Sequence, residues 1–295
     1  MPDKMHDDEI EVPASLVRKL LSSQFPRWAH LPLRRVQSMG TVHAMYRLGD
    51  DMAVRLPTIP REHSLDKELR WLPWLALRLP LPIPEPLAEG RPDHGYLWRW
   101  AIFRWIEGET WARDRVDDLC EAAEHLAEFL HALQRLDPGD GPRANAGAPG
   151  TSISFRDERV RFAIASTHEM LDTTALTAAW ETALEASEWD AEPRWLHGDV
   201  LGGNVLTSGG RLRAIIDWGS AAVGDPACDL MAAWSLFSGE SRTRFQSAMA
   251  ADDATWARAR GWAINRVVNV WYYANSNPPF AADARDTIDN VLADQ

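Results

Sequence analysis

The first hundred residues combine one helical pattern with several short strand patterns. Apolar positions recur at helical spacing from Pro13 to Phe25, which predicts an amphipathic helix. Leucines between 61 and 77 define a second helix, which Pro73 should kink or split. Short apolar runs bounded by turn residues predict five strands, at 33–38, 43–48, 52–56, 87–89 and 96–104. This part of the chain therefore predicts an antiparallel sheet accompanied by helices.

The rest of the chain is mainly helical in pattern. An apolar stripe from Val116 to Leu133 predicts a core helix, capped upstream by Asp114 or a residue nearby. A stretch rich in Gly, Pro and Ala, residues 138–150, predicts a mobile loop. Further helices are expected at 155–171, 175–189, 226–237, 243–249, 253–273 and 281–292.

One hairpin interrupts these helices and carries polar residues at its ends. Residues 205–206 and 212–216 predict two short strands joined across a Thr-Ser-Gly-Gly turn. Asp199 lies in a turn before the hairpin, Asn204 comes directly before its first strand, and Asp217 follows its second strand. Two carboxylates and a carboxamide are thus placed at the ends of short apolar runs.

This trio has the chemistry that phosphoryl transfer requires. One carboxylate can accept or orient the proton of an attacking hydroxyl, while an amide oxygen and a second carboxylate can hold Mg²⁺ against phosphates. Zinc does not fit, because neither Cys120 nor Cys228 lies at a ligand spacing from a histidine. The alternative is structural, a surface turn followed by two loop residues.

The motifs of residues 195–230 resemble those of the aminoglycoside phosphotransferase family, which also includes choline, homoserine, fructosamine, sugar and macrolide kinases. They read His-Gly-Asp-x-x-x-x-Asn, then Ile-Ile-Asp-Trp, then Gly-Asp-Pro-x-x-Asp-Leu. The resemblance implies that Asp199 is the catalytic base, that Asn204 and Asp217 bind Mg²⁺, and that ATP or GTP is the phosphoryl donor. Asp225 and Asp229 are better explained structurally, as a helix N-cap and a residue of that helix's first turn.

The same resemblance implies a two-lobed α+β fold of the protein-kinase type. The N-terminal lobe, residues 1–104, would bind the nucleotide with an antiparallel sheet and a helix. The C-terminal lobe, residues 105–295, would be mainly helical and carry catalysis and substrate binding, with a hinge at about 103–108.

On the nucleotide side, Arg55 occupies the strand position where kinases usually carry a lysine. Arginine can bind phosphate through two parallel hydrogen bonds, so the phosphate-binding role can survive. Glu68 is the expected partner of Arg55, with Glu62 as the fallback, and a solvent-facing arginine is the alternative. The resemblance also implies that a turn with Ser38, Gly40 and Thr41 covers the nucleotide phosphates. It implies that backbone groups of Arg104 and Ile106 contact the purine.

Charge is unevenly divided along the 295 residues, whose formal net charge is −12. Residues 1–104 carry a net charge of +2 and residues 105–295 carry −14. An acidic second half disfavours nucleic acid and would attract a cationic acceptor, although acidity can also serve solubility alone.

The identity of the acceptor stays open in the sequence. A cationic aminoglycoside would suit the acidic residues Glu107, Glu109, Asp157, Glu158 and Asp283. A macrolide would suit the Trp-rich C-terminal lobe, where Trp218 and Trp271 are candidates, although a Trp at helical spacing is usually a core residue. A sugar, choline or an amino-acid metabolite is a further alternative. A nucleotide-binding pseudokinase without transferase activity is the alternative from another class.

The sequence favours the cytoplasm as the compartment. It has no run of about 18 uncharged apolar residues, its N-terminus is acidic and polar, and its two cysteines do not indicate a disulfide framework. We expect no membrane partner, a monomer or homodimer, and a link to antibiotic resistance if the acceptor is an antibiotic.

Overall fold

The computed structural model describes residues 9–36, 43–59 and 62–294, the side chains of 62–64 excepted. The chain divides into two compact units. Unit 1 comprises Met1–Arg78 and Pro82–Glu107, and unit 2 comprises Leu79–Leu81 and Gly108–Gln295.

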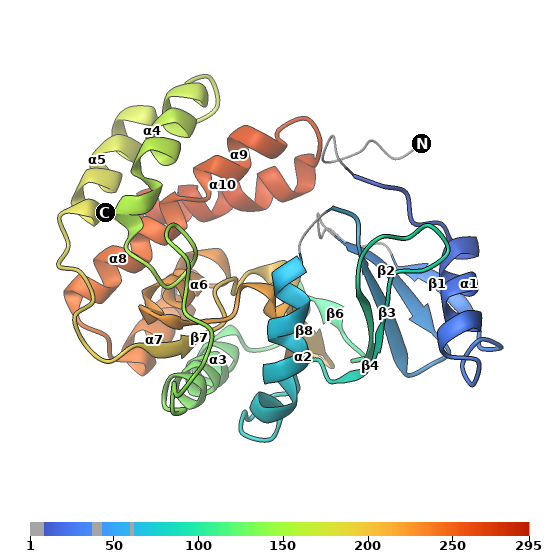
Figure 1. The fold of residues 1–295 in the computed structure, drawn as a ribbon. Helices are drawn as coiled ribbons and strands as arrows, with labels where there is room; N and C mark the ends of the chain where they lie inside the picture. The colour runs from blue at the N-terminus through green and yellow to red at the C-terminus, as the bar shows by residue number, and fades with distance from the viewer. Residues whose placement is uncertain (1–8, 37–42, 60–61, 295) are drawn as a thin grey trace. The chain divides into compact units, whose positions relative to one another are not determined.

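Unit 1 is built on a five-stranded antiparallel sheet in the order β1-β2-β3-β5-β4 (Figure 1). Every residue of the central strand β3 is buried, because the strand is flanked on both edges and covered on both faces. The last strand begins at Trp100 and not at Tyr96, because Tyr96 pairs with Asp93 in a tight turn. The strands are β1 (Leu33–Val36), β2 (His43–Leu48), β3 (Met52–Pro57), β4 (Pro86–Gly90) and β5 (Trp100–Arg104).

Two helices accompany this sheet. Helix α1 (Ala14–Gln24) buries the apolar face predicted for it, and Leu20 and Leu21 join a core with Tyr46 and Ile102 of the sheet. Helix α2 (Glu62–Ala76) contains Pro73 and is not split by it. An antiparallel sheet with helices is therefore confirmed for unit 1.

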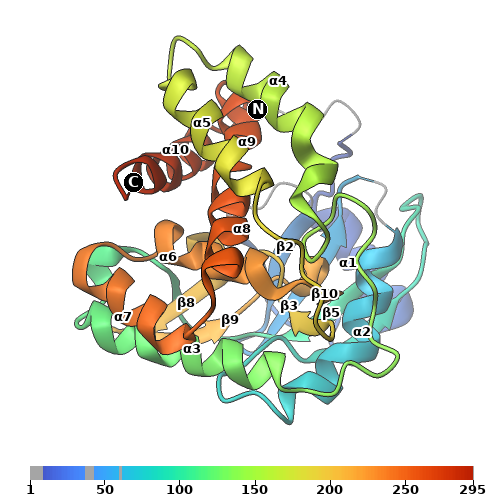
Figure 2. The same cartoon turned by 90° about the vertical axis from the view of Figure 1, so that its left-hand side faces the viewer.

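Unit 2 is mainly helical and contains two small sheets (Figure 2). Strand β7 (Arg194–Leu196) pairs with β10 (Ala222–Gly224), and a second sheet has the order β6-β8-β9, with β6 (Glu109–Thr110), β8 (Val205–Ser208) and β9 (Arg211–Ile215). The α-helices are α3 (Leu119–Gln134), α4 (Asp157–Ser166), α5 (Thr173–Leu184), α6 (Ala232–Ser235), α7 (Gly239–Met249), α8 (Asp253–Ile264), α9 (Val267–Tyr273) and α10 (Pro278–Leu292). Short 3₁₀ turns are η1 (Arg113–Arg115), η2 (Ile153–Arg156), η3 (Gly202–Asn204), η4 (Trp218–Ser220) and η5 (Pro226–Met231).

The N-cap of α3 is Asp118, a residue near Asp114 as expected, because the Asp118 carboxylate accepts the N–H groups of Cys120 and Glu121. Two predictions for unit 2 are wrong in detail. The helix expected over 226–237 is the 3₁₀ turn η5 followed by the short α6. The helix expected over 253–273 is two helices that meet at Asn265 and Arg266.

Within the described ranges, no helix combines the length and the apolar character needed to cross a bilayer.

Candidate active site

The turn that carries Asp199 begins where strand β7 ends, and it requires glycine. Trp195, Leu196 and His197 are all fully buried, so the turn begins inside the core, directly after β7. Gly198 has a φ of +83°, and a Cβ atom there would lie 2.8 Å from the backbone oxygen of Ser220. Both the backbone angle and this close approach exclude a side chain, so the turn lies against the segment that follows β9.

The buried carboxylate of Asp229 holds the backbone of this turn in place. The two oxygens of Asp229 each accept a backbone N–H at 2.7 Å, one from His197 and one from Gly198. Burial raises the pKa of Asp229 to about 7, although the two N–H groups favour its charged form. Asp229 is thus structural, as expected, but it anchors the turn that carries Asp199 and not only its own helix.

His197 connects the same turn to the end of strand β9. Its Nε2 lies 3.0 Å from the carbonyl oxygen of Ile216, and its Nδ1 accepts the N–H of Asp199 at 3.2 Å. These partners require the neutral ring with its proton on Nε2. Burial lowers the pKa of His197 to about 4, so the ring stays neutral at physiological pH. His197 therefore orients the turn that carries Asp199.

Asp199 and Asn204 are in direct contact. Asn204 Nδ2 donates to the Asp199 carbonyl oxygen at 2.9 Å and to its carboxylate Oδ2 at 2.8 Å. Burial raises the pKa of Asp199 to about 6, and the negative charge of Asp217 raises it further, while Arg266 and Asn204 oppose the shift. A carboxyl group with a pKa near neutrality is suited to accept a proton.

Hairpin geometry brings Asp217 to the same end as Asn204. Val205 of β8 pairs with Ile215 of β9, and the backbone N–H of Ile216 donates to the Asn204 carbonyl at 2.8 Å. Asp217 then takes a left-handed conformation with a φ of 61°, which is costly for a residue with a side chain and is common at functional sites. The structure therefore brings Asp199, Asn204 and Asp217 together.

The residues of this trio fit a hard divalent cation. Because Asn204 turns its amide nitrogen to Asp199, its Oδ1 is directed elsewhere and is a suitable oxygen ligand. The charge of Asp217 acts on the Asp199 carboxyl, so two carboxylates share a small region, where a divalent cation would relieve their repulsion.

In unit 1, Arg55 and Glu68 form a buried ion pair. Arg55 Nη1 donates to Glu68 Oε1 at 2.9 Å, and Nη2 contacts Oε2, so the pair is bidentate. Arg55 is 9% exposed and Glu68 1% exposed. The expected partner is thus correct, and the alternative of a solvent-facing arginine is wrong. Glu62, as fallback, has a side chain outside the described part of the chain.

Other predicted nucleotide contacts have mixed outcomes. Ser38, Gly40 and Thr41 lie outside the described residues. The N–H of Arg104 donates to the Glu85 carbonyl oxygen at 2.8 Å, and the contact of the Arg104 backbone with the purine stays a prediction. Ile106, half-buried, remains a prediction.

Of the predicted acceptor residues, Asp157 has structural contacts and stays a prediction, whereas Trp218 is buried. Asp157 Oδ1 accepts both the Arg161 Nε at 2.7 Å and the Trp180 indole N–H at 2.8 Å, which ties α4 to α5. Trp218 is 1% exposed and packs edge-on against the His197 ring at 4.8 Å, so it supports the turn and does not line a surface.

Three further candidates, Glu107, Glu158 and Trp271, also stay predictions. Glu107 is exposed and contacts Arg47 within unit 1. Glu158 is exposed in the first turn of α4, and Trp271 is half-buried on α9, where it packs edge-on against Phe162 at 5.1 Å.

Sequence reasoning missed Arg266, whose charge acts on Asp199. No motif surrounds it, and 67 residues separate the two along the chain. Asp225 is the predicted N-cap, accepting the Ala227 N–H at 3.0 Å, and it also forms a buried pair with Arg258 at 2.8 Å that the sequence did not indicate.

Comparison with known proteins identifies the family and the fold. A family model described as the phosphotransferase enzyme family matches residues 35–262. The solved structure of an aminoglycoside phosphotransferase, APH(2″)-IIIa, with GDP and kanamycin is 18% identical, with a TM-score of 0.70, over 95% of this chain and 99% of that chain. Macrolide 2′-phosphotransferase type I is 20% identical, with a TM-score of 0.60, over 93% of this chain and 97% of that chain. Macrolide 2′-phosphotransferase MphH from Brachybacterium faecium is 21% identical, with a TM-score of 0.57, over 92% of this chain and 98% of that chain. A search of curated protein sequences gives no match.

Proposed function

The chain belongs to the phosphotransferase enzyme family, and we propose that it transfers the γ-phosphoryl group of ATP or GTP to a hydroxyl group of a small molecule. The observation that carries this proposal is the contact of Asp199 with Asn204, at the hairpin end where Asp217 also lies. A partly buried base beside two oxygen ligands is the arrangement that phosphoryl transfer needs.

In the proposed reaction, Asp199 accepts a hydrogen bond from the acceptor hydroxyl and orients its oxygen toward the γ-phosphorus. A new bond forms between that oxygen and phosphorus, while the bond from phosphorus to the β–γ bridging oxygen breaks. The hydroxyl proton passes to Asp199, and ADP or GDP leaves with the bonding electron pair. Asn204 keeps the carboxylate of Asp199 in place through its hydrogen bond.

Asn204 Oδ1 and the Asp217 carboxylate would hold Mg²⁺. When bound, the ion supplies positive charge against the phosphate oxygens and the leaving group. The remaining residues of the turn, His197 and Asp229, act by position, because they fix the backbone on both sides of Asp199.

On the donor side, we assign Arg55 to the nucleotide phosphates and Glu68 to the orientation of its guanidinium. The bidentate contact between them supports this assignment, because it fixes the planar group of Arg55 within the sheet. Solved structures with similar folds are described as complexes with GDP, ADP or ATP, which supports a purine nucleotide donor.

For the acceptor, we propose an aminoglycoside-type antibiotic, the class named for several structures of the same fold. The negative charge of residues 105–295 supports a cationic molecule. A macrolide is the second candidate, favoured by exposed aromatic rings near α4 and α9, where Phe162 is 57% and Tyr272 44% exposed. Either activity would inactivate an antibiotic and so give resistance.

The test is acceptor-dependent ADP or GDP release by the purified chain with Mg²⁺, against kanamycin, a macrolide, a neutral sugar and choline. We expect release with one class and none with Asp199→Asn. A protein that binds nucleotide but releases none with any acceptor would contradict the proposal and support the pseudokinase alternative.

A further inference from the structure

Unpaired polar atoms gather where helix α8 meets α9. Among the described residues, buried side-chain atoms without a hydrogen-bond partner include Trp262 Nε1, Asn265 Oδ1, and Arg266 Nε and Nη1. The three residues stand at positions i, i+3 and i+4 of a backbone that stays helical through the junction, so they share one face. Arg156 of η2, over the Trp262 ring at 5.9 Å, adds an unpaired Nε. We refer to these four residues as the donor cluster.

Arg266 is the central member of the donor cluster. It is 2% exposed, lies over the Phe280 ring at 5.5 Å, and donates through Nη2 to Asp283 Oδ2 at 2.6 Å. Its other two nitrogens named above have no acceptor in the described part of the chain. Since a buried guanidinium loses its hydration, donors left without acceptors are costly.

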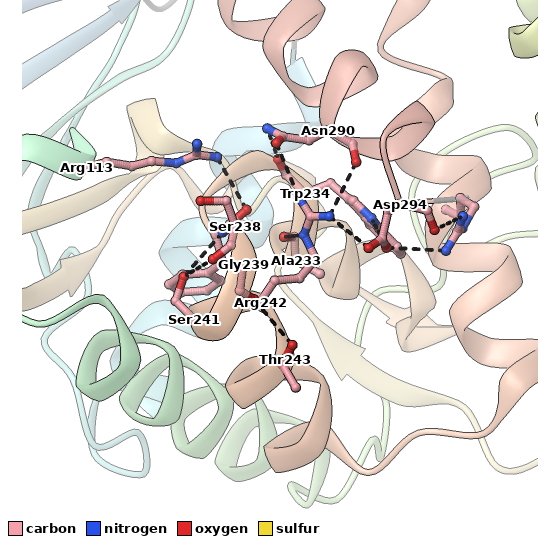
Figure 3. Close-up of polar contacts among 12 residues, drawn as sticks. Arg113, Ala233, Trp234, Ser238, Gly239, Ser241, Arg242, Thr243, Asn290 and Asp294 are labelled. Atoms are coloured by element: carbon pink, nitrogen blue, oxygen red, sulfur yellow. Dashed lines mark hydrogen bonds and ion pairs between the residues drawn. The ribbon is translucent and has the colours of Figure 1, made fainter.

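Two other buried arginines of unit 2 show that the fold can satisfy such groups. Arg242 donates to Ala233 and Asn290 and pairs with Asp294 at 3.0 Å, a network visible in Figure 3. Arg258 bonds to Asp225, Thr255 and the carbonyl oxygen of Ser187. Every nitrogen of these two guanidinium groups has an acceptor. The open donors of Arg266 contrast with those of Arg242 and Arg258 and call for an external partner.

The donor cluster lies near the catalytic base. The charges of Arg266 and Asp283 both act on Asp199, and Arg266 lowers the pKa of Asp199 while Asp283 raises it. The Asp283 side chain is 36% exposed, so the buried Arg266 is paired with a residue that reaches the surface. A small group that passes Asp283 would meet the free N–H groups next to Asp199.

We propose that the donor cluster binds an oxygen-bearing group of the acceptor, a hydroxyl, ether or carboxylate next to the hydroxyl that is phosphorylated. Four of its five open atoms are N–H donors, which match oxygen lone pairs. An ammonium group carries only donors, so it is excluded from this position and must lie elsewhere on a cationic acceptor. This rests on the proposed function and narrows its substrate class to molecules with several oxygens around the reacting hydroxyl.

Conservative variants of the full chain test this role. Trp262→Phe removes one unpaired donor and keeps an aromatic ring, and Arg266→Lys keeps the charge beside Asp283 but loses the guanidinium and its two unpaired donors. With the acceptor that the wild-type protein phosphorylates, we expect each variant to raise the acceptor KM by about tenfold, the effect of one lost hydrogen bond to a charged or buried group. The nucleotide KM and the melting temperature should change little.

Matched controls come from the satisfied network of Figure 3. Trp234→Phe removes an indole N–H that donates to Asp294 at 3.0 Å, and Arg242→Lys removes paired donors. These two variants should lower the melting temperature and leave the acceptor KM unchanged. If the donor cluster had a purely structural role, Trp262→Phe and Arg266→Lys would also lower the melting temperature and leave the acceptor KM unchanged.

The outcomes separate the two proposals. No transfer by the wild-type protein to any acceptor would overturn the proposed function and with it the acceptor role. Transfer with an unchanged acceptor KM in both Trp262→Phe and Arg266→Lys would overturn the donor cluster alone. So would a preference for choline, whose hydroxyl neighbours a quaternary ammonium and not an oxygen.

Discussion

His197 Nε2 lies 3.0 Å from the carbonyl oxygen of Ile216, which joins the turn of Asp199 to the strand end of Asp217. A single neutral imidazole thus relates the proposed base to a proposed metal ligand 18 residues away. The bond requires the proton on Nε2, because Nδ1 already accepts the Asp199 N–H.

We predict that His197 does not titrate in the range where the enzyme works. Burial lowers its pKa to about 4, so its ring signals in NMR should stay constant from pH 6 to 9. A midpoint between pH 6 and 7 assigned to His197 would contradict this geometry.

Asp199 should produce an acid limb in the pH profile. With a pKa of about 6 in the free protein, the base is protonated below that pH and loses its function. We therefore expect kcat/KM to fall about tenfold per pH unit below pH 6 and to level off above it. A cation bound beside Asp217 would move the limb to lower pH, so raising the Mg²⁺ concentration should shift it in that direction.

Substitutions of the two carboxylates should have different effects. Asp199→Asn should lower kcat by about 10²–10⁴-fold and leave nucleotide binding intact, because the base acts only on the acceptor hydroxyl. Asp217→Asn should instead weaken Mg²⁺-dependent nucleotide binding, measured by calorimetry with and without the ion. Normal turnover by Asp199→Asn would refute its role.

Asp229→Asn should weaken both the turn and catalysis. An amide has one acceptor oxygen and directs its NH₂ at one of the two N–H groups, so we expect a loss of about 2–3 kcal/mol in unfolding free energy. Asp252→Asn is the control, because Asp252 caps α8 at the surface through the Thr255 N–H and should cost about 1 kcal/mol or less. Denaturant unfolding measures both, and kcat should fall only in Asp229→Asn.

The pKa of Asp229 also has a consequence for stability. Its folded value of about 7 lies above the usual 3.8, so the folded state holds an extra proton between these pH values. This contribution to stability is full below about pH 4 and is lost as the pH rises through 7. Asp229→Asn should therefore flatten the decline of the melting temperature from pH 5 to 8, relative to the wild-type protein.

In unit 1, Arg55→Lys tests the proposed phosphate-binding role of the arginine at the strand position where kinases usually carry a lysine. Lysine keeps the charge but cannot reproduce the bidentate contact with Glu68. We expect a nucleotide KM raised several-fold with little change in the acceptor KM. Glu68→Gln should leave Arg55 less firmly oriented and raise the same KM, and an unchanged value in both variants would contradict the phosphate role.

Much of the site could be predicted because its chemistry is local. Asp199 and Asn204 are five residues apart, and the hairpin that brings Asp217 beside them is formed by neighbouring strands, so turn residues and apolar runs suffice to place them. The pair of Arg55 and Glu68 followed from one strand and the next helix.

The sequence by itself therefore determined the fold class, the proximity of Asp199, Asn204 and Asp217, and the ion pair of the sheet. Only the tertiary structure decided that Trp218 is buried behind His197, that Asp157 is held by Trp180, that Asp229 holds the turn of Asp199, and that Arg266 acts on Asp199. Each of these relationships joins separate elements, and packing of whole helices sets their distances. The spacing of apolar and polar residues predicts the helix or strand to which a residue belongs. It does not predict which side chain, distant in the sequence, will pack against that residue.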